Sequence, residues 1–370
     1  MAAERDAARP AGRLLWYLSC ELPTEGQASH THMMGISRGL EGLGWRTRLF
    51  HPAIRRGPRG AIRRLLDMTT MQLRLMASLH RPDVLYVRGH FASLPAVLWA
   101  KVRRVPVVWE LNGPGSDILS SWPRLRPVLG LLLVSITLQV RLSNATIGVT
   151  PALADAARAR GARRVFVVPN GADTELFAPS ARTSVELPAR FVSFIGTLAR
   201  WQGINTVIDA LARPAWPADV ALVVAGDGVM AETVREQAAL DPRLVFLGRV
   251  GHQEVAGIVA RGICGLSPMV EPSRSLSGVV PLKLFEALAC GVAVIVTDLP
   301  GQADIVRQDQ VGLVIPPGDP DALAAAVASL AADPAATEAM GRRARTVAVE
   351  HYSWAGRAAE TNVIIEGVLR

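Results

Sequence analysis

A lysine and a glutamate in the second half of the chain have the types and spacing to bind a diphosphate and a sugar hydroxyl. Lys283 and Glu286 stand three residues apart in the segment PLKLFEALACGVAVIVTD, so they share one face of a predicted helix. Pro281 suits the first position of that helix, which leaves the amides of Leu282 and Lys283 unpaired at its positive end. This pattern predicts phosphate binding through Lys283 and ribose binding through Glu286. The alternative is a weak ion pair on the surface.

The scarcity of lysine favours the phosphate interpretation. Of the 40 basic residues, 38 are arginine and only two are lysine, Lys101 and Lys283. A chain that uses arginine almost everywhere is most simply the product of a biased genome. A lysine directly before a helical carboxylate then indicates a need for a compact ammonium group.

Composition excludes several classes of protein. The chain has 370 residues, of which 50% are hydrophobic and 19% charged, so it is long enough for two domains and unlike a disordered protein. Residues 1–180 hold 24 basic and 12 acidic side chains, whereas residues 181–370 hold 16 and 20. The basic half is therefore expected to face an anionic partner. The three cysteines have no metal or redox spacing and indicate reduced thiols in a cytosolic protein, and no signal peptide is recognisable.

Short apolar runs alternate with segments of helical periodicity, as in proteins built on parallel sheets. We expect strands at Leu14–Leu18, Arg46–Phe50, Val84–Val87, Val105–Trp109, Ala145–Val149, Val165–Val168, Phe191–Ile195, Ala221–Ala225, Leu244–Leu247, Gly262–Ser267, Val292–Thr297 and Gly312–Ile315. We expect helices at Ser29–Leu43, Pro151–Arg160, Gly203–Ala212, Val229–Ala239, His252–Ala260, Pro281–Ala289, Pro320–Ala331 and Pro334–Glu350.

Two such series predict an α/β fold with two doubly wound, Rossmann-like domains. The expected order is a flexible tail at 1–12, a first domain at 13–178, a second at 189–350 and a closing helix at 351–370 that packs back on the first. The stretch Ala178–Ala189, rich in Pro, Ser and Arg, is expected to be the linker. Ligands of such folds bind at the carboxyl ends of the strands, so the natural site is a cleft between the domains.

The segment PLKLFEALACGVAVIVTDLPGQADIV resembles the signature helix of family 4 glycosyltransferases, which have the GT-B fold. Other similar segments follow in the family's order, and the resemblance covers roughly residues 14–360. They are VPNGADTELFAP, FIGTLARWQGINTVIDAL, VVAGDGVM, VFLGRV, GLVIPPGDPDALAAAV and HYSWAGRA.

The resemblance implies a retaining transfer of a sugar from a nucleoside diphosphate sugar, without a metal or other cofactor. By position, Glu286 binds the ribose, and the backbone at Leu282 and Lys283 meets the diphosphate. Gly26 lies in the glycine loop that faces the donor phosphates, and Asn112 stands near the place where many members carry a histidine beside the donor sugar. The nucleobase packs against Gly248, Arg249 and Val250. Uridine is the expected base by family frequency alone.

Two departures from the family pattern concern the donor sugar. The usual Glu-x7-Glu pair is incomplete, because Gly278 stands eight residues before Glu286. Some members with a Pro-x-Lys-x-x-Glu form also lack that first glutamate, and this chain resembles that subgroup. Glu271 or the backbone at 275–278 is the candidate replacement.

The second departure affects the phosphate loop that begins at Gly196. Thr197 and Gln202 occupy the places of the usual arginine and lysine. A diphosphate leaving group needs cationic or amide stabilisation as charge develops on it. Arg200 and Lys283 are therefore the predicted catalytic cations.

The first domain offers further candidates near its strand ends. His30 is expected near the incoming acceptor hydroxyl, with helix capping or packing as the alternative for both His30 and His32. Arg88 and Glu110 form either an internal ion pair or a substrate contact, and His90 is expected to be structural. No general base is assigned, because in a front-face retaining mechanism the leaving phosphate can accept the acceptor's proton.

Two basic, apolar segments in the first half predict a membrane surface. Arg55–Arg81 and Trp122–Arg141 interleave arginines with large apolar residues, a pattern typical of interfacial helices. The apolar run Pro127–Val140 is expected to be too short to span a bilayer. Such a surface would suit a lipid-linked acceptor. The alternative is that the apolar run is a buried core helix and that the arginines only solvate the surface. Nucleic acid is not expected, since no recognition motif is present.

Three functions remain open from the sequence. The first is a glycosyltransferase that builds a cell-envelope glycan or exopolysaccharide at the inner face of the membrane. The second is a transferase that acts on a soluble acceptor. The third is a catalytically weak GT-B subunit that binds a nucleotide sugar, as the missing first glutamate suggests.

Overall fold

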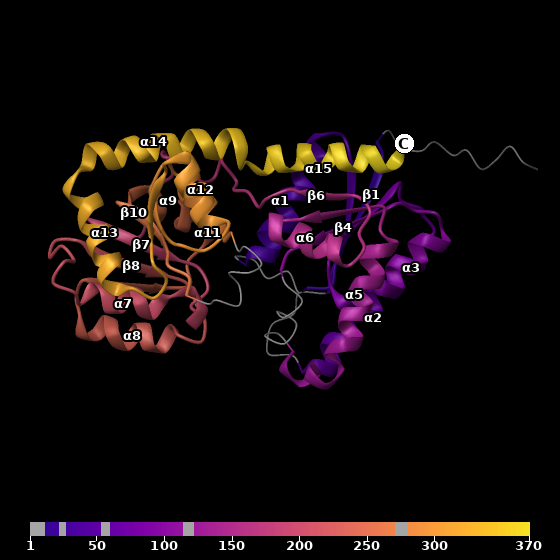
Figure 1. Cartoon of the computed structure of the whole chain (residues 1–370), viewed down its shortest axis with the longest axis horizontal. Coiled ribbons are helices and arrows are strands. Elements are labelled where there is room, and N and C mark those ends of the chain that lie inside the picture. The colour runs from indigo at the N-terminus through magenta and orange to yellow at the C-terminus, as the bar shows by residue number, and fades with distance from the viewer. Residues whose placement is uncertain (1–11, 22–26, 53–59, 114–121, 271–279) are drawn as a thin grey trace, which may run out of the picture. The chain divides into compact units, whose positions relative to one another are not determined.

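A computed structural model describes residues 12–21, 27–52, 60–113, 122–270 and 280–370 of the chain. The predicted site residues Gly26, Glu271 and Gly278 lie outside these ranges. The chain divides into two compact units, with Met1–Pro169 and Arg357–Arg370 in unit 1 and Asn170–Gly356 in unit 2 (Figure 1). Each unit contains a parallel six-stranded sheet with helices packed on it, so the α/β fold class with two domains is confirmed.

The sheet of unit 1 has the strand order β2-β1-β3-β4-β5-β6 and is parallel throughout. Its strands are β1 (Leu14–Ser19), β2 (Arg46–Phe50), β3 (Val84–Arg88), β4 (Val107–Leu111), β5 (Ala145–Gly148) and β6 (Val165–Val167). Its helices are α1 (Ala28–Gly42), α2 (Ala61–Met76), α3 (Leu94–Val102), α5 (Leu129–Leu142) and α6 (Pro151–Ala159), with short 3-10 turns η1 (Phe91–Ser93) and η2 (Pro123–Val128).

Helices α2, α3 and α5 cover one face of this sheet. Alternate strand residues such as Trp16, Leu85 and Trp109 join one core cluster with buried residues of all three helices, including Leu75 and Val140. Helix α3 contacts both α2 and α5, so the three form a continuous layer. Helix α2 lies within the predicted interfacial segment Arg55–Arg81, and α5 overlaps the segment Trp122–Arg141. Helix α3 is absent from the sequence-based prediction, because apolar residues occur on both of its faces and blur the helical periodicity.

The sheet of unit 2 has the order β12-β11-β10-β7-β8-β9, also parallel. Its strands are β7 (Phe191–Ile195), β8 (Ala221–Ala225), β9 (Leu244–Gly248), β10 (Cys264–Ser267), β11 (Ala293–Thr297) and β12 (Gly312–Ile315). Its helices are α7 (Ile204–Leu211), α8 (Ala231–Leu240), α9 (His252–Arg261), α11 (Leu282–Ala289), α12 (Gln302–Asp309), α13 (Pro320–Ala332) and α14 (Pro334–His351), with the 3-10 turn η3 (Arg200–Gln202).

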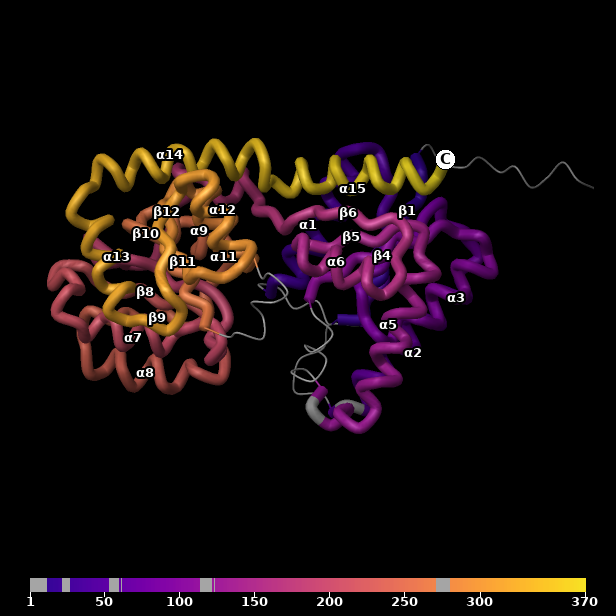
Figure 2. The backbone as a smooth tube through the Cα atoms, viewed as in Figure 1, coloured from indigo at the N-terminus to yellow at the C-terminus, as the bar shows by residue number. Residues whose placement is uncertain are grey.

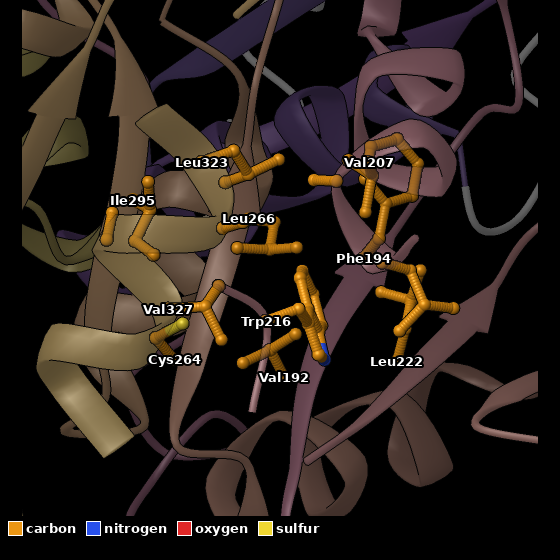
Figure 3. Packing of buried hydrophobic residues seen from close by; sticks show 14 of the residues in the cluster. Val192, Phe194, Val207, Trp216, Leu222, Cys264, Leu266, Ile295, Leu323 and Val327 are labelled. Carbon is orange, nitrogen blue, oxygen red and sulfur yellow. The ribbon is translucent and has the colours of Figure 1, made fainter. Parts of the chain in front are cut away.

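Alternation along the strands of unit 2 fills a separate core on each face of the sheet. Val192 and Phe194 of β7 pack with Trp216 on one face, as Figure 3 shows. Phe191 and Ile195 of the same strand pack on the other face with residues of α9, α11 and α14. Burial on both faces explains why these strands are apolar without interruption.

The twelve predicted strands are all present, and their ends lie within two residues of the predicted ends. The eight predicted helices are also present. One detail differs at the motif helix: α11 begins at Leu282, and Pro281 is its extended N-cap residue rather than its first helical residue.

The C-terminal helix α15 (Trp354–Leu369) runs from the end of unit 2 into unit 1, as the backbone trace shows (Figure 2). Its later residues contact the amino ends of β1 and β2, where Arg13 pairs with Glu366 and the Trp45 indole donates to Asn362 at 2.7 Å. Tyr352, just before this helix, packs its ring 4.7 Å from that of Phe285.

The unit boundary falls between Pro169 and Asn170, earlier than the predicted end of the first domain at 178. Residues 170–178 belong to unit 2, where the Arg345 guanidinium donates to the carbonyls of Thr174 and Phe177 at 3.0 Å. The predicted linker 178–189 also packs on unit 2, because Glu254 accepts hydrogen bonds from Thr183 and Ser184. Apolar side chains in this stretch fix it to the unit 2 core, which its Pro and Ser content concealed.

Candidate functional site

Three glycines mark the carboxyl ends of neighbouring strands in unit 2. The amide of Gly196, after β7, donates to Ala225, and the amide of Gly226, after β8, donates to Gly248 at the end of β9. A Cβ at Gly226 would lie 1.8 Å from the Gly196 carbonyl oxygen, and Gly226 has a φ of +151°. Only glycine fits there, and the strand ends therefore approach closely and present bare backbone.

Lys283 reaches this edge from the first turn of α11. Its ammonium nitrogen lies 4.1 Å from the centre of the Phe194 ring, and its Cε would lie 3.7 Å from a Cβ built on Gly196. The nitrogen is shielded from solvent and has no hydrogen-bond partner among the described residues. Since Lys283 carries three donors, the site holds unused capacity to bind an anion.

Burial shifts the protonation of Lys283 and Glu286 in opposite directions. Desolvation lowers the pKa of Lys283 to about 7, against a smaller opposing effect of Glu286. Desolvation raises the pKa of Glu286 to about 7, against the effect of Lys283. Both groups are therefore poised near neutrality, where a charged ligand can change their ionisation. Both side chains are partly buried, and the Lys283 nitrogen has no hydrogen-bond partner among the described residues, so the surface ion pair considered above is not formed.

The phosphate loop after β7 places its predicted residues in different surroundings. Thr197 and Arg200 are exposed, and Arg200 is the first residue of η3. Gln202 is buried at 6% exposure, and its Oε1 has no hydrogen-bond partner among the residues that the structure describes. Gly203 then turns the chain with a φ of +78°, where a Cβ would lie 1.7 Å from the Pro268 carbonyl oxygen.

The predicted nucleobase residues lie at the end of β9. Gly248 has a φ of +63°, Arg249 is exposed and Val250 is partly buried against the core below the sheet. Leu282, at the start of α11, is buried at 9% exposure. The structure therefore brings Gly196 and Lys283 into contact and places Thr197, Arg200, Gln202, Gly248, Arg249, Val250 and Glu286 on loops and a helix at the carboxyl ends of this sheet.

Unit 1 holds a second buried cluster, centred on Glu110 at the end of β4. Its carboxylate accepts hydrogen bonds from Tyr86, from Arg88 at 3.4 Å and from Asn112, and it lies 2.9 Å from Nε2 of His32. Burial alone would raise the pKa of Glu110, but the charge and hydrogen bonds of His32, with Arg88 and Tyr86, lower it to about 2. The Arg88 and Glu110 pair is thus internal, the first of the two interpretations considered.

The candidates of unit 1 divide between this cluster and its margins. Asn112 is partly buried and donates to Glu110, so one of the two N–H donors of its amide is already in use. His30 lies partly buried in the first turn of α1, whose N-cap is Gln27. His90 caps η1 by accepting from the Ala92 amide, and burial lowers its pKa to about 4, so its role is structural.

Sequence reasoning missed three partners of these clusters. Phe194 lies beneath the Lys283 ammonium, Tyr86 donates to Glu110, and Glu21 accepts from Arg88 at 3.0 Å. No local motif marks them, since each pair is distant in the chain. Among the described residues no three His, Cys, Asp or Glu side chains gather as a metal site, and all three cysteines are buried and unpaired.

The two units match different family models. Residues 29–176 match the model described as Glycosyltransferase Family 4, and residues 189–333 match the one described as Glycosyl transferases group 1. Together the two matches cover most of both units. This chain is a family 4-type glycosyltransferase.

The chain is also similar to individual proteins, in sequence to one relative and in fold to two solved structures. The glycosyltransferase is 27% identical over 286 residues to the glycogen synthase of Mycobacterium tuberculosis (strain CDC 1551 / Oshkosh), a match that covers 74% of this chain and 66% of the relative, just under two thirds of its length. The sucrose-phosphate synthase of Thermosynechococcus elongatus has a similar fold, with a TM-score of 0.77 and 19% identity, over 96% of this chain and 99% of that one. So does HepE of Anabaena in complex with UDP-glucose, with a TM-score of 0.71 and 18% identity, over 96% of this chain and 99% of that one.

Proposed function

We propose that this glycosyltransferase moves a sugar from a nucleoside diphosphate sugar to an acceptor hydroxyl with retention at the anomeric carbon, without a metal. The observation that supports it most strongly is the buried, unpartnered ammonium of Lys283 beside the bare backbone of Gly196. A diphosphate would supply the missing hydrogen-bond acceptors and the balancing charge. UDP is the proposed nucleotide, supported by the UDP-glucose bound in HepE.

In this proposal each residue at the carboxyl edge of unit 2 has a separate role. Lys283 and the exposed Arg200 stabilise the charge that develops on the leaving diphosphate. Glu286, one turn further along α11, binds the ribose hydroxyls, and the loop Gly248–Val250 packs on the base. Asn112 directs its side-chain oxygen to the donor sugar, because its nitrogen donates to Glu110.

For the acceptor we propose a lipid-linked glycan of cell-envelope or exopolysaccharide synthesis, with the enzyme in the cytoplasm at the inner face of the membrane. The support is the basic, apolar character of unit 1. A soluble acceptor is the second candidate. A weak sugar-nucleotide-binding subunit is the third, and Gly278 in place of the usual glutamate favours it.

The test is a thermal-shift screen of the full chain with UDP-glucose, GDP-mannose and other nucleoside diphosphate sugars. A concentration-dependent rise in Tm with one of them is expected, because binding to the folded state stabilises it. The rise in Tm should disappear in Lys283→Met. It should persist in the control Arg342→Met, which removes an exposed cation of unit 2 on α14. If no nucleoside diphosphate sugar stabilises the chain, the donor proposal is wrong.

Slow hydrolysis of the bound donor distinguishes an active glycosyltransferase from a subunit that binds the nucleotide sugar with little turnover. The enzyme should release free sugar and nucleoside diphosphate even without an acceptor, and the sugar should first appear with the donor's anomeric configuration. Release that is undetectable, from a chain that still binds the donor, would favour the binding subunit.

A further inference from the structure

The helical layer on one face of unit 1 leaves many large apolar side chains uncovered. Helices α2, α3 and α5 contribute the following exposed residues: Ile62, Leu65, Leu66, Leu73, Leu98, Val102, Leu131, Val134 and Leu138. The same three helices pack on the sheet through other residues, so their exposed faces are not needed for the core. A concentration of this kind on one layer marks an interaction surface. We call it the α2–α3–α5 face (Figure 1).

On α2 the exposed apolar residues form a single stripe. Ile62, Leu66 and Leu73 are spaced by four and seven residues, so they follow one side of the helix. Arg63 and Arg74, both exposed, are eleven residues apart and lie on the same side of the helix beside that stripe, about three turns from each other. An apolar stripe flanked by arginines is the pattern of a helix that lies in a membrane interface.

Helix α5 repeats this arrangement. Leu131, Val134 and Leu138 share its exposed side, and Leu131 is 69% exposed. Exposed arginines stand beyond both ends of that stripe, with Arg126 before it and Arg141 after it. Long arginine side chains at the ends of an apolar stripe can reach lipid headgroups while the stripe enters the acyl boundary.

The charge of the α2–α3–α5 face selects its partner. Segments 61–81, 94–104 and 123–142 together hold ten basic residues and one acidic residue, Asp67. A second copy of the face would bring like charges together, whereas an anionic lipid surface would neutralise them. The face is therefore complementary to anionic lipid and repels itself.

Helix length alone would also permit α5 to cross a bilayer. The helical segment Arg124–Leu142 has 19 residues and a mean hydropathy of 1.5, and only 17% of its most apolar window is buried. This helical segment is longer than the apolar run Pro127–Val140, which the sequence predicts to be too short to span a bilayer. Length and composition leave both a spanning and an interfacial position open.

Polar contacts of α5 decide between these positions. Gln139 is fully buried, donates to the carbonyls of His90 and Phe91 at 3.1 and 3.3 Å, and accepts from the Trp109 indole at 3.3 Å. Ser135 also donates to the Phe91 carbonyl, at 2.7 Å. Withdrawing α5 into lipid would leave these groups without partners, which is costly in an apolar medium. The helix therefore stays on unit 1.

We propose that the α2–α3–α5 face docks unit 1 on an anionic bilayer, with α2 and α5 lying in the interface rather than spanning it. The apolar stripes enter the acyl boundary, and the flanking arginines bind the headgroups. This surface rests on the membrane location proposed above and specifies it. It is independent of the donor chemistry proposed for unit 2, so the flotation test and the donor-binding test can fail separately.

The test is flotation of the full chain with vesicles of equal parts phosphatidylglycerol and phosphatidylcholine, compared with vesicles of phosphatidylcholine alone. The wild type is expected to float with the anionic vesicles at low salt and to be released by an alkaline carbonate wash. Since each basic residue near an anionic leaflet contributes roughly 1 kcal/mol, Arg63→Gln with Arg74→Gln should lower partitioning about 30-fold. Leu131→Ser with Leu138→Ser should lower it about tenfold or more.

Matched controls come from exposed residues away from the face. Arg38→Gln with Arg163→Gln removes the same charge from other parts of unit 1, and Val363→Ser with Val229→Ser removes exposed apolar side chains elsewhere. Both control pairs should float like the wild type. All the substituted side chains are exposed, and circular dichroism can confirm that each variant is folded.

Three outcomes would overturn the proposal. The first is a wild type that does not float with anionic vesicles at low salt. The second is retention after the carbonate wash, which would indicate a spanning helix. The third is concentration-dependent self-association that Leu131→Ser with Leu138→Ser abolishes, without vesicle binding, which would make a second copy the partner.

Discussion

Two acidic groups, buried Glu110 in unit 1 and partly buried Glu286 in unit 2, have opposite surroundings. Glu110 in unit 1 accepts hydrogen bonds from Tyr86, Arg88 and Asn112 and pairs with His32, and its pKa falls to about 2. Glu286 in unit 2 has Lys283 as its charged neighbour, and its pKa rises to about 7. A buried charge whose hydrogen bonds are complete is held permanently ionised and fixes the structure. A buried pair whose bonds are incomplete is close to neutrality and can respond to a ligand.

The same contrast holds for the cations. Arg88 lies between two carboxylates, which keep its pKa above its ordinary value despite burial. Lys283 has an aromatic face below it and no hydrogen-bond acceptor among the described residues, so burial lowers its pKa. The first cation belongs to the scaffold of unit 1, and the second is the better candidate for binding an external anion.

Removing the Glu110 carboxylate should have the largest effect. Glu110→Gln removes the negative charge beside Arg88 and replaces one acceptor oxygen by an NH2 group that faces other donors. Breaking a buried pair of this kind costs about 3–5 kcal/mol. The first transition in urea unfolding should shift to lower concentration by a corresponding amount. Because the folded pKa is depressed, the stabilisation is present above the ordinary value of 4.5 and is lost as the pH falls toward 2.

The control for this prediction is Asp155→Asn, which removes an exposed carboxylate paired with Arg158. It should change the unfolding free energy by about 0.5 kcal/mol or less. If Glu110→Gln is as stable as this control, the Glu110 cluster does not stabilise unit 1, and the contrast with the Lys283 and Glu286 pair of unit 2 is wrong.

Replacing Lys283 should affect chemistry rather than folding. Lys283→Met is expected to lower turnover of the donor about 10²–10³-fold, the effect of losing one group that stabilises the transition state. Stability should stay level or rise, because an ammonium without hydrogen bonds is costly to bury. Donor hydrolysis and urea unfolding measured on the same sample test both parts. A destabilised variant with unchanged turnover would place Lys283 with the scaffold.

The pH dependence of donor affinity should show the smallest effect. The diphosphate favours protonated Lys283, whose proton is lost from the empty site as the pH rises through about 7. Glu286 gains its negative charge over the same range. Affinity for UDP-glucose should therefore be highest below about pH 7 and fall by up to roughly tenfold per unit above it. Titration calorimetry at several pH values measures this.

Lys283→Arg provides the matched comparison for the pH profile. Arginine stays protonated throughout this range, so its profile should be flatter than that of the wild type. A wild-type affinity that does not change across neutrality would show that Lys283 does not titrate on donor binding.

Much of the fold was predictable because its signals are local. Continuous apolar runs such as Ala221–Ala225 and Ala293–Thr297 mark strands buried on both faces, and the predicted ends are accurate. Helix α3 was not predicted, because exposed Leu98 and Val102 add apolar residues to the side opposite its buried face. The unit boundary at Pro169 was also missed, since residues 170–189 are fixed by long-range contacts of Arg345 and Glu254.

The sequence by itself determined the two α/β sheets, the resemblance to family 4 and the choice of Lys283 and Glu286 as a pair on one helix face. Those features depend on residue type and spacing along a short segment. Only the tertiary structure decided that Lys283 is buried over Phe194 without a hydrogen-bond acceptor and that Glu110 is surrounded by donors. Burial and partnership depend on residues far apart in the chain, and they set whether a charge supports the fold or remains available to a ligand.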